Sequence, residues 1–337
     1  MKRCAKEDMR RVLRAWSKDY RVIGPTLQAQ GDCIFDDFDE ETLILDYGKP
    51  SLPPKGTLFP QSEITFTVRG GDYHENTTRE KVILFGIRAC DMMGIRQAAN
   101  FMERGFDDPF YRRRRENVLT VVMACNGPQN ENCFCTTMRS GPWAEKEFDL
   151  QFFDMGDAYL VETGSKRGEA LLADEYFIDA TPEDDGRLAT LKKEAAASIT
   201  DVPAVKEAMD RLAANDVDES VWDYFGGKCI VCGGCTFVCP TCTCFTVYDA
   251  VRGPQEGERV RAWDACLFGG FTREASGHNP RGSQGLRLKR RHEHKLLDYN
   301  ASDIQEAVSG CVGCGRCSDY CPVHIGTIEV VKALAAR

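Results

Sequence analysis

Two apolar runs mark the first half of the chain. Val82–Ile87 and Val118–Met123 are almost uninterrupted by polar residues. Runs of this kind are typical of strands that are buried on both faces of a parallel sheet. The segment from about Met92 to Arg104 lies between them and has a helical pattern. Strand, helix and strand in this order predict a βαβ unit.

Weaker patterns fill the rest of the chain. Residues 5–20 form a charged amphipathic pattern, which predicts a surface helix. Residues 40–70 alternate like strands but are broken by prolines, which indicates a sheet edge or a loop. Residues 148–163 predict two short strands around a turn. Residues 185–216 are rich in Ala, Lys and Glu and predict a helical connector, and residues 325–336 predict a final helix.

Cysteine is the most informative residue type, with 17 among 337 residues. The stretch Cys229–Pro240 reads C-I-V-C-G-G-C-T-F-V-C-P, and Cys311–Pro322 reads C-V-G-C-G-R-C-S-D-Y-C-P. Both follow C-x2-C-x2-C-x3-C-P, the bacterial ferredoxin run that binds a [4Fe–4S] cubane. A zinc site would use paired cysteine ligands instead. Two runs with the same spacing therefore disfavour zinc and predict two cubanes.

The spacing also predicts which thiolate belongs to which cubane. Three thiolates on one loop can reach three corners of a cubane, while the fourth turns away and binds the other cluster. The first [4Fe–4S] cluster is then expected on Cys229, Cys232, Cys235 and Cys321. The second is expected on Cys311, Cys314, Cys317 and Cys239.

Four cysteines of the N-terminal half are candidates for a third cluster. Cys90 and Cys125 follow the two apolar runs, and Cys133 and Cys135 come soon afterwards. Because neighbouring parallel strands end at the same edge of a sheet, these four thiols could converge. Free cysteines are also common as small buried apolar residues. The Cys-x-Cys pair favours a third iron–sulfur cluster over that structural role.

A long insertion separates the two ferredoxin runs and adds Cys242, Cys244 and Cys266. These thiols could pack as an apolar shell, donate S–H groups near the first cluster, replace a conventional ligand or help to bind another centre. The conventional ligands are preferred because both runs are complete. The basic stretch 287–295 is an exposed helix face, a source of positive charge that favours a reduced cluster, or a docking face for an acidic donor.

Charge and missing signals exclude several classes of function. The net charge is −9, which disfavours a nucleic-acid binder. No run of 18 apolar residues predicts a membrane span, and the first residues lack the apolar segment of an export signal. Cysteines in metal spacing without an export signal predict a cytoplasmic protein. No dinucleotide, P-loop, nucleophile-elbow or zinc-protease motif is present, so we expect a subunit without a catalytic site of its own.

These patterns predict an α+β fold of two domains. We expect an α/β domain in residues 1–184, with the candidate third cluster, and a helical connector in residues 185–220. The C-terminal part, residues 221–337, is then a ferredoxin-type 2[4Fe–4S] domain with helical packing around its clusters.

The motifs together resemble the A subunit of anaerobic sulfite reductase and its relatives, the iron–sulfur beta subunits of sulfhydrogenases. The stretches that carry this resemblance are Arg88–Asp91, Glu131–Cys135, Cys235–Cys244, Arg261–Cys266 and Cys311–Cys317. The ferredoxin runs alone are generic, whereas Cys-Pro-Thr-Cys-Thr-Cys and the N-terminal Cys-Asp and Cys-Phe-Cys elements are more specific. The resemblance covers most of the chain.

The resemblance implies an electron-transfer subunit with two partners. A flavin subunit that oxidises NAD(P)H would supply the electrons. A sirohaem sulfite reductase subunit that reduces sulfite to sulfide would receive them, under anaerobic conditions. The alternative acceptor is the NiFe subunit of a sulfhydrogenase or a related sulfur-reducing complex. A redox-sensing regulatory protein is a third hypothesis, and it predicts DNA binding or a dimer without other subunits; the acidic composition disfavours it.

Overall fold

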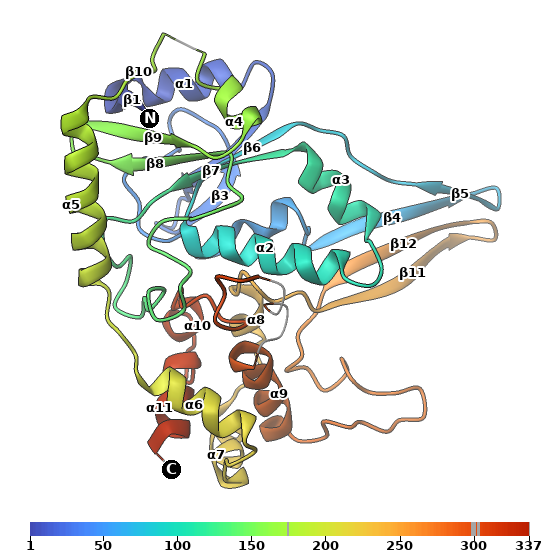
Figure 1. Cartoon of the computed structure of the whole chain (residues 1–337). Coiled ribbons are helices and arrows are strands. Elements are labelled where there is room, and N and C mark those ends of the chain that lie inside the picture. The colour runs from blue at the N-terminus through green and yellow to red at the C-terminus, as the bar shows by residue number, and fades with distance from the viewer. Residues whose placement is uncertain (174, 298–300, 302–303, 337) are drawn as a thin grey trace.

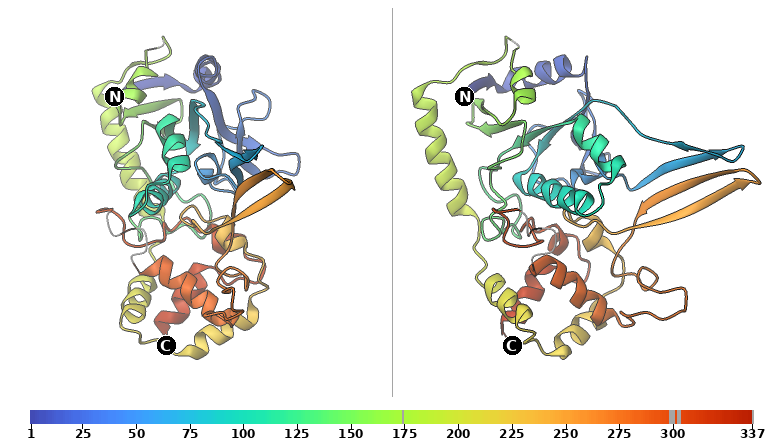
Figure 2. Two further views of the ribbon diagram at one scale, coloured as in Figure 1. Left: turned by 90° about the vertical axis from the view of Figure 1, so that its right-hand side faces the viewer. Right: turned by 45° about the vertical axis from the view of Figure 1, so that its right-hand side comes forward.

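The computed structural model describes residues 1–173, 175–297, 301 and 304–336. A sheet flanked by helices forms one end of the molecule, and a group of helices forms the other end (Figure 1). A second, smaller sheet projects from the side (Figures 1 and 2). The expected α+β fold with a helical C-terminal part is therefore confirmed.

The large sheet has eight strands in the order β10-β1-β9-β8-β7-β6-β2-β3. Its central strands β2, β6, β7 and β8 are parallel neighbours, and the outer strands pair antiparallel. Both predicted buried strands, β6 (Val82–Ile87) and β7 (Val118–Met123), are present and fully buried. The other strands are β1 (Lys2–Ala5), β2 (Arg21–Leu27), β3 (Cys33–Asp37), β8 (Leu150–Asp154), β9 (Ala158–Thr163) and β10 (Ile178–Asp179).

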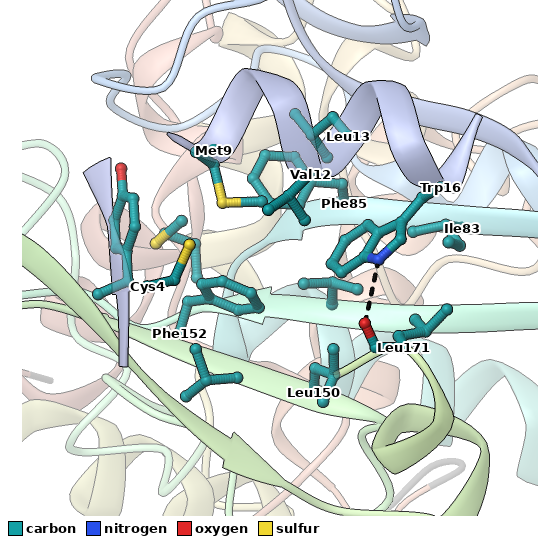
Figure 3. Close-up of a cluster of buried hydrophobic side chains, with 14 of the residues drawn as sticks. Cys4, Met9, Val12, Leu13, Trp16, Ile83, Phe85, Leu150, Phe152 and Leu171 are labelled. Carbon is teal, nitrogen blue, oxygen red and sulfur yellow. Dashed lines mark hydrogen bonds between the residues drawn. The ribbon is translucent and has the colours of Figure 1, made fainter. Parts of the chain in front are cut away.

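Alternate side chains of the central strands pack on the two faces of this sheet. Helix α1 (Met9–Trp16) covers one face, and its apolar residues pack with Phe85 and Phe152 (Figure 3). The Trp16 indole N–H donates a hydrogen bond of 3.3 Å to the Leu171 carbonyl. Helix α2 (Ala89–Glu103) covers the other face. Each large apolar side chain buried in this way contributes about 1.5–3 kcal/mol to stability.

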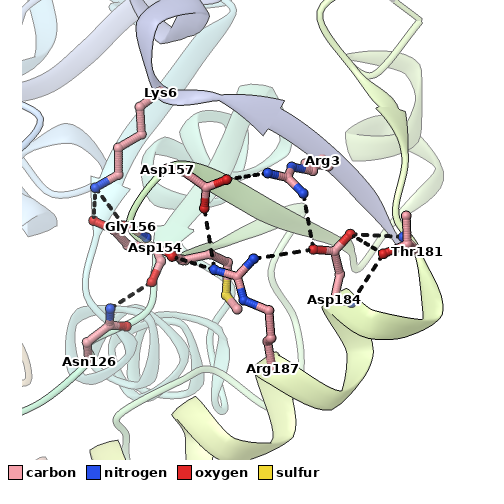
Figure 4. Close-up of polar contacts among 10 residues, drawn as sticks. Arg3, Lys6, Asn126, Asp154, Gly156, Asp157, Thr181, Asp184 and Arg187 are labelled. Atoms are coloured by element: carbon pink, nitrogen blue, oxygen red, sulfur yellow. Dashed lines mark hydrogen bonds and ion pairs between the residues drawn. The ribbon is translucent and has the colours of Figure 1, made fainter.

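The segment 185–220, which the sequence predicts to be a helical connector, contains most of α5 (Pro182–Ser198) and all of α6 (Ala204–Ala213). A capping box between Thr181 and Asp184 begins α5. Arg3 on β1 forms ion pairs with Asp157 and, at 3.3 Å, with Asp184 (Figure 4). The first strand of the chain is thereby tied to the start of α5.

The smaller sheet joins segments that lie far apart in the sequence. Its strand order is β11-β12-β4-β5, where β4 is Ser62–Arg69, β5 is Asp72–Glu75, β11 is Phe245–Gly253 and β12 is Glu256–Trp263. The insertion between the ferredoxin runs thus pairs with a strand from residues 40–70. Buried Glu63 holds the two halves together through ion pairs with Arg261 (2.6 Å) and Arg114 (2.5 Å).

The C-terminal helices pack around a second apolar core that includes Trp222, Leu288 and Val331. They are α7 (Glu219–Lys228), α8 (Gly234–Phe237), α9 (Gln284–Leu296), α10 (Arg316–Asp319) and α11 (Thr327–Ala336). The remaining helices are α3 (Pro109–Asn117) and α4 (Lys166–Ala170), with 3-10 turns at Lys6–Asp8 and Pro54–Thr57. Among the described residues, no helix combines the length and the apolar character that crossing a membrane would require.

Candidate metal centres

The two ferredoxin runs have the same local geometry. A short helix begins directly after a left-handed glycine in each run, at Gly233 with φ 72° and at Gly315 with φ 74°. A Cβ atom at Gly233 would lie 2.6 Å from the Phe268 ring, and one at Gly315 would lie 2.4 Å from the Asn132 carbonyl oxygen. Only glycine combines this backbone conformation with such close packing. The repeated motif therefore produces two similar cysteine loops.

The first loop brings Cys229, Cys232 and Cys235 together. Burial raises the pKa of Cys235 to about 11; the charge of Arg291 opposes this increase, and the nearby sulfurs of Cys229 and Cys232 add to it. The Gln284 side-chain amide donates a hydrogen bond of 3.1 Å to Cys229 Sγ. Cys321, the fourth ligand expected from the spacing, packs against the same apolar core as Cys229.

The second loop brings Cys311, Cys314 and Cys317 together with Cys239 of the first run. Burial raises the pKa of Cys311 to about 12, and the sulfurs of Cys317, Cys314 and Cys239 contribute in the same direction. The Gly313 N–H donates to Cys311 Sγ at 3.4 Å. The structure thus groups the four residues that the crossed spacing predicts for the second cluster.

Three buried cations, Lys55, Arg291 and Lys295, lie beside these loops. The described residues include no carboxylate that forms an ion pair with any of the three. Cysteine sulfurs favour the charged form of all three side chains, against the effect of burial, and Cys239 acts on each of them. A cluster with four thiolate ligands carries net negative charge, so this arrangement of buried cations fits the iron–sulfur groups that the spacing predicts.

The basic stretch 287–295 forms a helix whose charged side chains face in two directions, some inward and some toward the surface. Arg291 and Lys295 point inward, where Arg291 donates to the Cys235 carbonyl at 3.2 Å and Lys295 donates to Thr241 Oγ1 at 2.6 Å. Arg290 stays at the surface with Glu293. The interpretation of this stretch as an exposed face is thus wrong for Arg291 and Lys295.

The four N-terminal cysteines line one small cavity. Cys90 lies at the start of α2, Cys125 lies just after β7, and Cys133 and Cys135 lie on the following loop. Lys49 and Arg88 line the same cavity. Burial is the main cause that raises the pKa of Cys90, Cys125 and Cys135. The structure therefore brings together the residues expected for a third cluster, beside two cations that suit thiolate ligands.

This cavity lies against the second ferredoxin loop. Cys314 is one of its lining residues. The Phe134 N–H donates to the Gly313 carbonyl at 2.9 Å, and Ser140 Oγ donates to the Val312 carbonyl at 2.5 Å. A Cβ atom at Gly313 would lie 2.5 Å from the Phe134 carbonyl oxygen. The two cysteine loops are in direct backbone contact.

The described residues contain no group of three Cys, His, Asp or Glu side chains that could hold a single metal ion. In a cubane each iron takes its own thiolate, so the ligands surround a cluster rather than one ion. A compact zinc-type group and a set of cubane ligands are therefore geometrically different.

The sequence interpretation missed several residues of these centres. Lys55 follows two prolines in a segment interpreted as a loop or a sheet edge, but it is buried and donates to the Cys242 carbonyl at 3.0 Å. Lys49 donates to the Cys314 carbonyl and pairs with Asp319 at 3.1 Å. Isolated lysines carry no sequence signal of this kind. Their positions follow from how the N-terminal loops pack on the ferredoxin loops.

Comparison with known proteins supports an iron–sulfur domain in the C-terminal part of the chain. A protein-family profile described as a 4Fe-4S dicluster domain matches residues 228–325. Sulfhydrogenase 2 subunit beta of Pyrococcus furiosus is 31% identical over 319 residues, which cover 92% of this chain and 91% of that protein. No solved structure matches the chain.

Proposed function

The chain belongs to the family of the sulfhydrogenase beta subunit, and we propose that it relays electrons from an NAD(P)H-oxidising flavin subunit to a catalytic subunit. The observation that carries this proposal is the direct contact between the cysteine-lined cavity of the N-terminal half and the second ferredoxin loop. Three cysteine groups in sequence, each beside buried positive charge, suit a path for electrons.

A bound [4Fe–4S] cluster takes up or gives up one electron at a time at a potential between about −700 and +450 mV. The residues of this chain would hold the clusters and set those potentials. Buried sulfur ligands, nearby cations and hydrogen bonds such as Gly313 N–H to Cys311 Sγ all act on the energy of the added electron. Apolar packing around the loops limits the access of water.

The order of the centres follows from their contacts. Cys235 and Cys317 interact electrostatically, so the two ferredoxin loops are neighbours. Cys314 lines the cavity of Cys90, Cys125, Cys133 and Cys135. We infer a path from the first cluster through the second to a third cluster at this cavity, and the direction of flow depends on which subunit binds at each end.

Two catalytic partners fit a relay of this kind. A sirohaem subunit that reduces sulfite to sulfide needs six electrons, which a chain of one-electron centres can deliver. The similarity to a protein named as a sulfhydrogenase subunit supports a NiFe partner as strongly as the six-electron argument supports a sirohaem partner. Anaerobic purification of the complex from its host separates the two, because sirohaem absorbance supports the first partner and bound nickel supports the second.

We place the complex in the cytoplasm, where the reducing conditions suit free thiols. All seventeen cysteines lie in the described residues, and none of them forms a disulfide there.

Iron counting tests the proposed centres. On anaerobically prepared protein, we expect about twelve irons per chain if three cubanes bind and about eight if only the ferredoxin loops are loaded. The variant C133S should lose about four irons, whereas C33S, which changes a cysteine outside the three groups, should lose none. Twelve irons in C133S would contradict the third site. A colourless chain that binds zinc instead would contradict the relay as a whole.

A further inference from the structure

Two hydrogen-bonded pairs of sulfurs lie in the C-terminal half, and one of them, Cys244 with Cys266, contains no proposed cluster ligand. Cys242 donates a hydrogen bond to Cys239, and Cys266 donates one to Cys244. Cys244 immediately precedes β11 and Cys266 follows β12, so both lie at the same end of this hairpin. The Asp264 N–H donates to the Cys244 carbonyl at 3.0 Å and fixes that end. The pairing of β11 with β12 therefore brings Cys244 and Cys266 together.

The two thiols of this pair have different environments. The side chain and the backbone N–H of Cys266 both hydrogen-bond to Cys244, and with help from Lys295 and Lys55 they lower the pKa of Cys244 to about 7. The same contact, together with burial, raises the pKa of Cys266. Cys244 is half-buried and Cys266 is buried. A more accessible thiolate next to a buried thiol is the arrangement found in dithiols that exchange with disulfides.

A cavity of about 270 Å³ opens onto this pair. Cys244 and Cys266 line it together with Phe271, Arg281, Arg291 and Lys295. Arg291 is only 2% exposed, and its Nε has no hydrogen-bond partner among the described residues. The cavity thus offers a nucleophilic sulfur, an aromatic wall and positive charge. These features suit a small molecule that carries both a disulfide and an anionic group.

We propose that Cys244 and Cys266 form a dithiol that undergoes thiol–disulfide exchange with a small anionic disulfide bound in this cavity. The Cys244 thiolate attacks one sulfur of the ligand, forms a mixed disulfide and releases one thiolate. Cys266 gives its proton to the first released thiolate, attacks Cys244 Sγ and releases the second thiolate. The two protein sulfurs are oxidised to a disulfide, and the ligand disulfide is reduced to one thiol and one thiolate, which then equilibrates with solvent.

The cysteine spacing separates this pair from the cluster ligands, because both ferredoxin runs are complete without Cys244 and Cys266. The pair nevertheless lies close to the first cluster site, because Cys266 interacts electrostatically with Cys235. Its oxidation would change the charge beside that site.

The test uses the intact holoprotein and dithiodiglycolate, a small disulfide with two carboxylates. In C266S the exchange should stop at the mixed disulfide, which peptide mass spectrometry should locate on Cys244. In the unchanged chain the same treatment should yield a Cys244–Cys266 disulfide. The variant C33S is the matched control, because Cys33 is also half-buried but burial raises its pKa to about 11.

Charge and iron content complete the test. Cystamine, a cationic disulfide of similar size, should react with Cys244 at least about 10-fold more slowly than dithiodiglycolate, because the cavity is positive. Iron content and the EPR signals of C244S and C266S should match those of the unchanged chain. Absence of the mixed disulfide, equal rates with both probes or loss of about four irons in these variants would overturn the proposal. Loss of iron would identify the pair as cluster ligands while leaving the relay intact.

Discussion

Arg316 holds Asp91 through two hydrogen bonds, from Nη1 to Oδ1 at 2.6 Å and from Nη2 to Oδ2 at 3.2 Å. Both side chains are fully buried. Arg316 lies between Cys314 and Cys317 of the second ferredoxin run, and Asp91 follows Cys90 of the N-terminal group. This pair therefore joins two cysteine groups that the relay requires to be neighbours. Nε of Arg316 also donates to the Pro50 carbonyl at 2.9 Å.

Removal of one member of this pair should be costly. In R316M the buried Asp91 carboxylate loses its partner, so we expect the free energy of unfolding to fall by about 3–5 kcal/mol. Urea unfolding of the purified chain measures this change. Adding D91N to R316M should recover part of the loss, since the uncompensated charge is then gone. The matched control is R14M, which breaks the exposed Arg14–Glu40 pair and should change stability little. Equal effects of R316M and R14M would contradict our interpretation.

Two glycines with nearly the same backbone conformation allow the cost of backbone strain to be measured separately from the cost of a steric clash. Gly105 has φ 76° with open space around it, whereas Gly315 has φ 74° and faces the Asn132 carbonyl. G105A should cost about 1–2 kcal/mol, the price of a left-handed alanine. G315A should cost clearly more, because the added carbon also pushes the two cysteine loops apart. Thermal unfolding measures the loss of stability, and iron content reports the integrity of the cysteine loops. Similar losses of stability in G105A and G315A would argue against close contact of the loops.

The buried charge of Lys295 should make the second cluster easier to reduce. Lys295 interacts with Cys239 and Cys311, two of the proposed ligands of that cluster. The variant K295M should therefore shift the potential of the cluster to more negative values. A shift on the order of tens of millivolts is expected for one charge about 10 Å away at an effective dielectric constant of about 20. EPR-monitored redox titration measures it, with R290M as the surface control. An unchanged or more positive potential in K295M would show that Lys295 has no such role.

Stability of the C-terminal helices should depend on His292. Burial, assisted by the charge of Arg291, lowers the pKa of His292 to about 3. Between pH 6.5 and about 3 the unfolded chain binds a proton that the folded chain does not. Stability is therefore complete above pH 6.5 and falls as the pH decreases, by up to about 1.4 kcal/mol per pH unit. The variant H292Q should show a flatter dependence in urea unfolding series, whereas H278Q, at an exposed site, should keep the original slope. An unchanged slope in H292Q would contradict a buried neutral His292.

Local patterns predicted the strands that are buried on both faces, but they missed others. Val82–Ile87 and Val118–Met123 are apolar throughout, so their strand character is evident without any partner. β2 contains Gly24 and Pro25, which normally interrupt strands. It forms because it pairs with β6 and β3, and because Gly24 leaves room for Leu43. The exposed strand β11 lacks a buried face and depends on its pairing with β12, so its sequence carries little signal.

The cysteine sites likewise include some that local sequence predicts and others that depend on tertiary packing. The sequence by itself determined two ferredoxin loops, because cubane ligation depends on short, local spacing of thiols and glycines along one stretch of chain. Only the tertiary structure decided that Cys90, Cys125, Cys133 and Cys135 share a cavity with Cys314, that Arg316 holds Asp91, and that Cys244 faces Cys266. These contacts join residues that the ends of strands and the packing of loops bring together. The strand ends predicted that the four N-terminal cysteines could converge, but their contact with Cys314 and the other two contacts depend on the packing of whole elements.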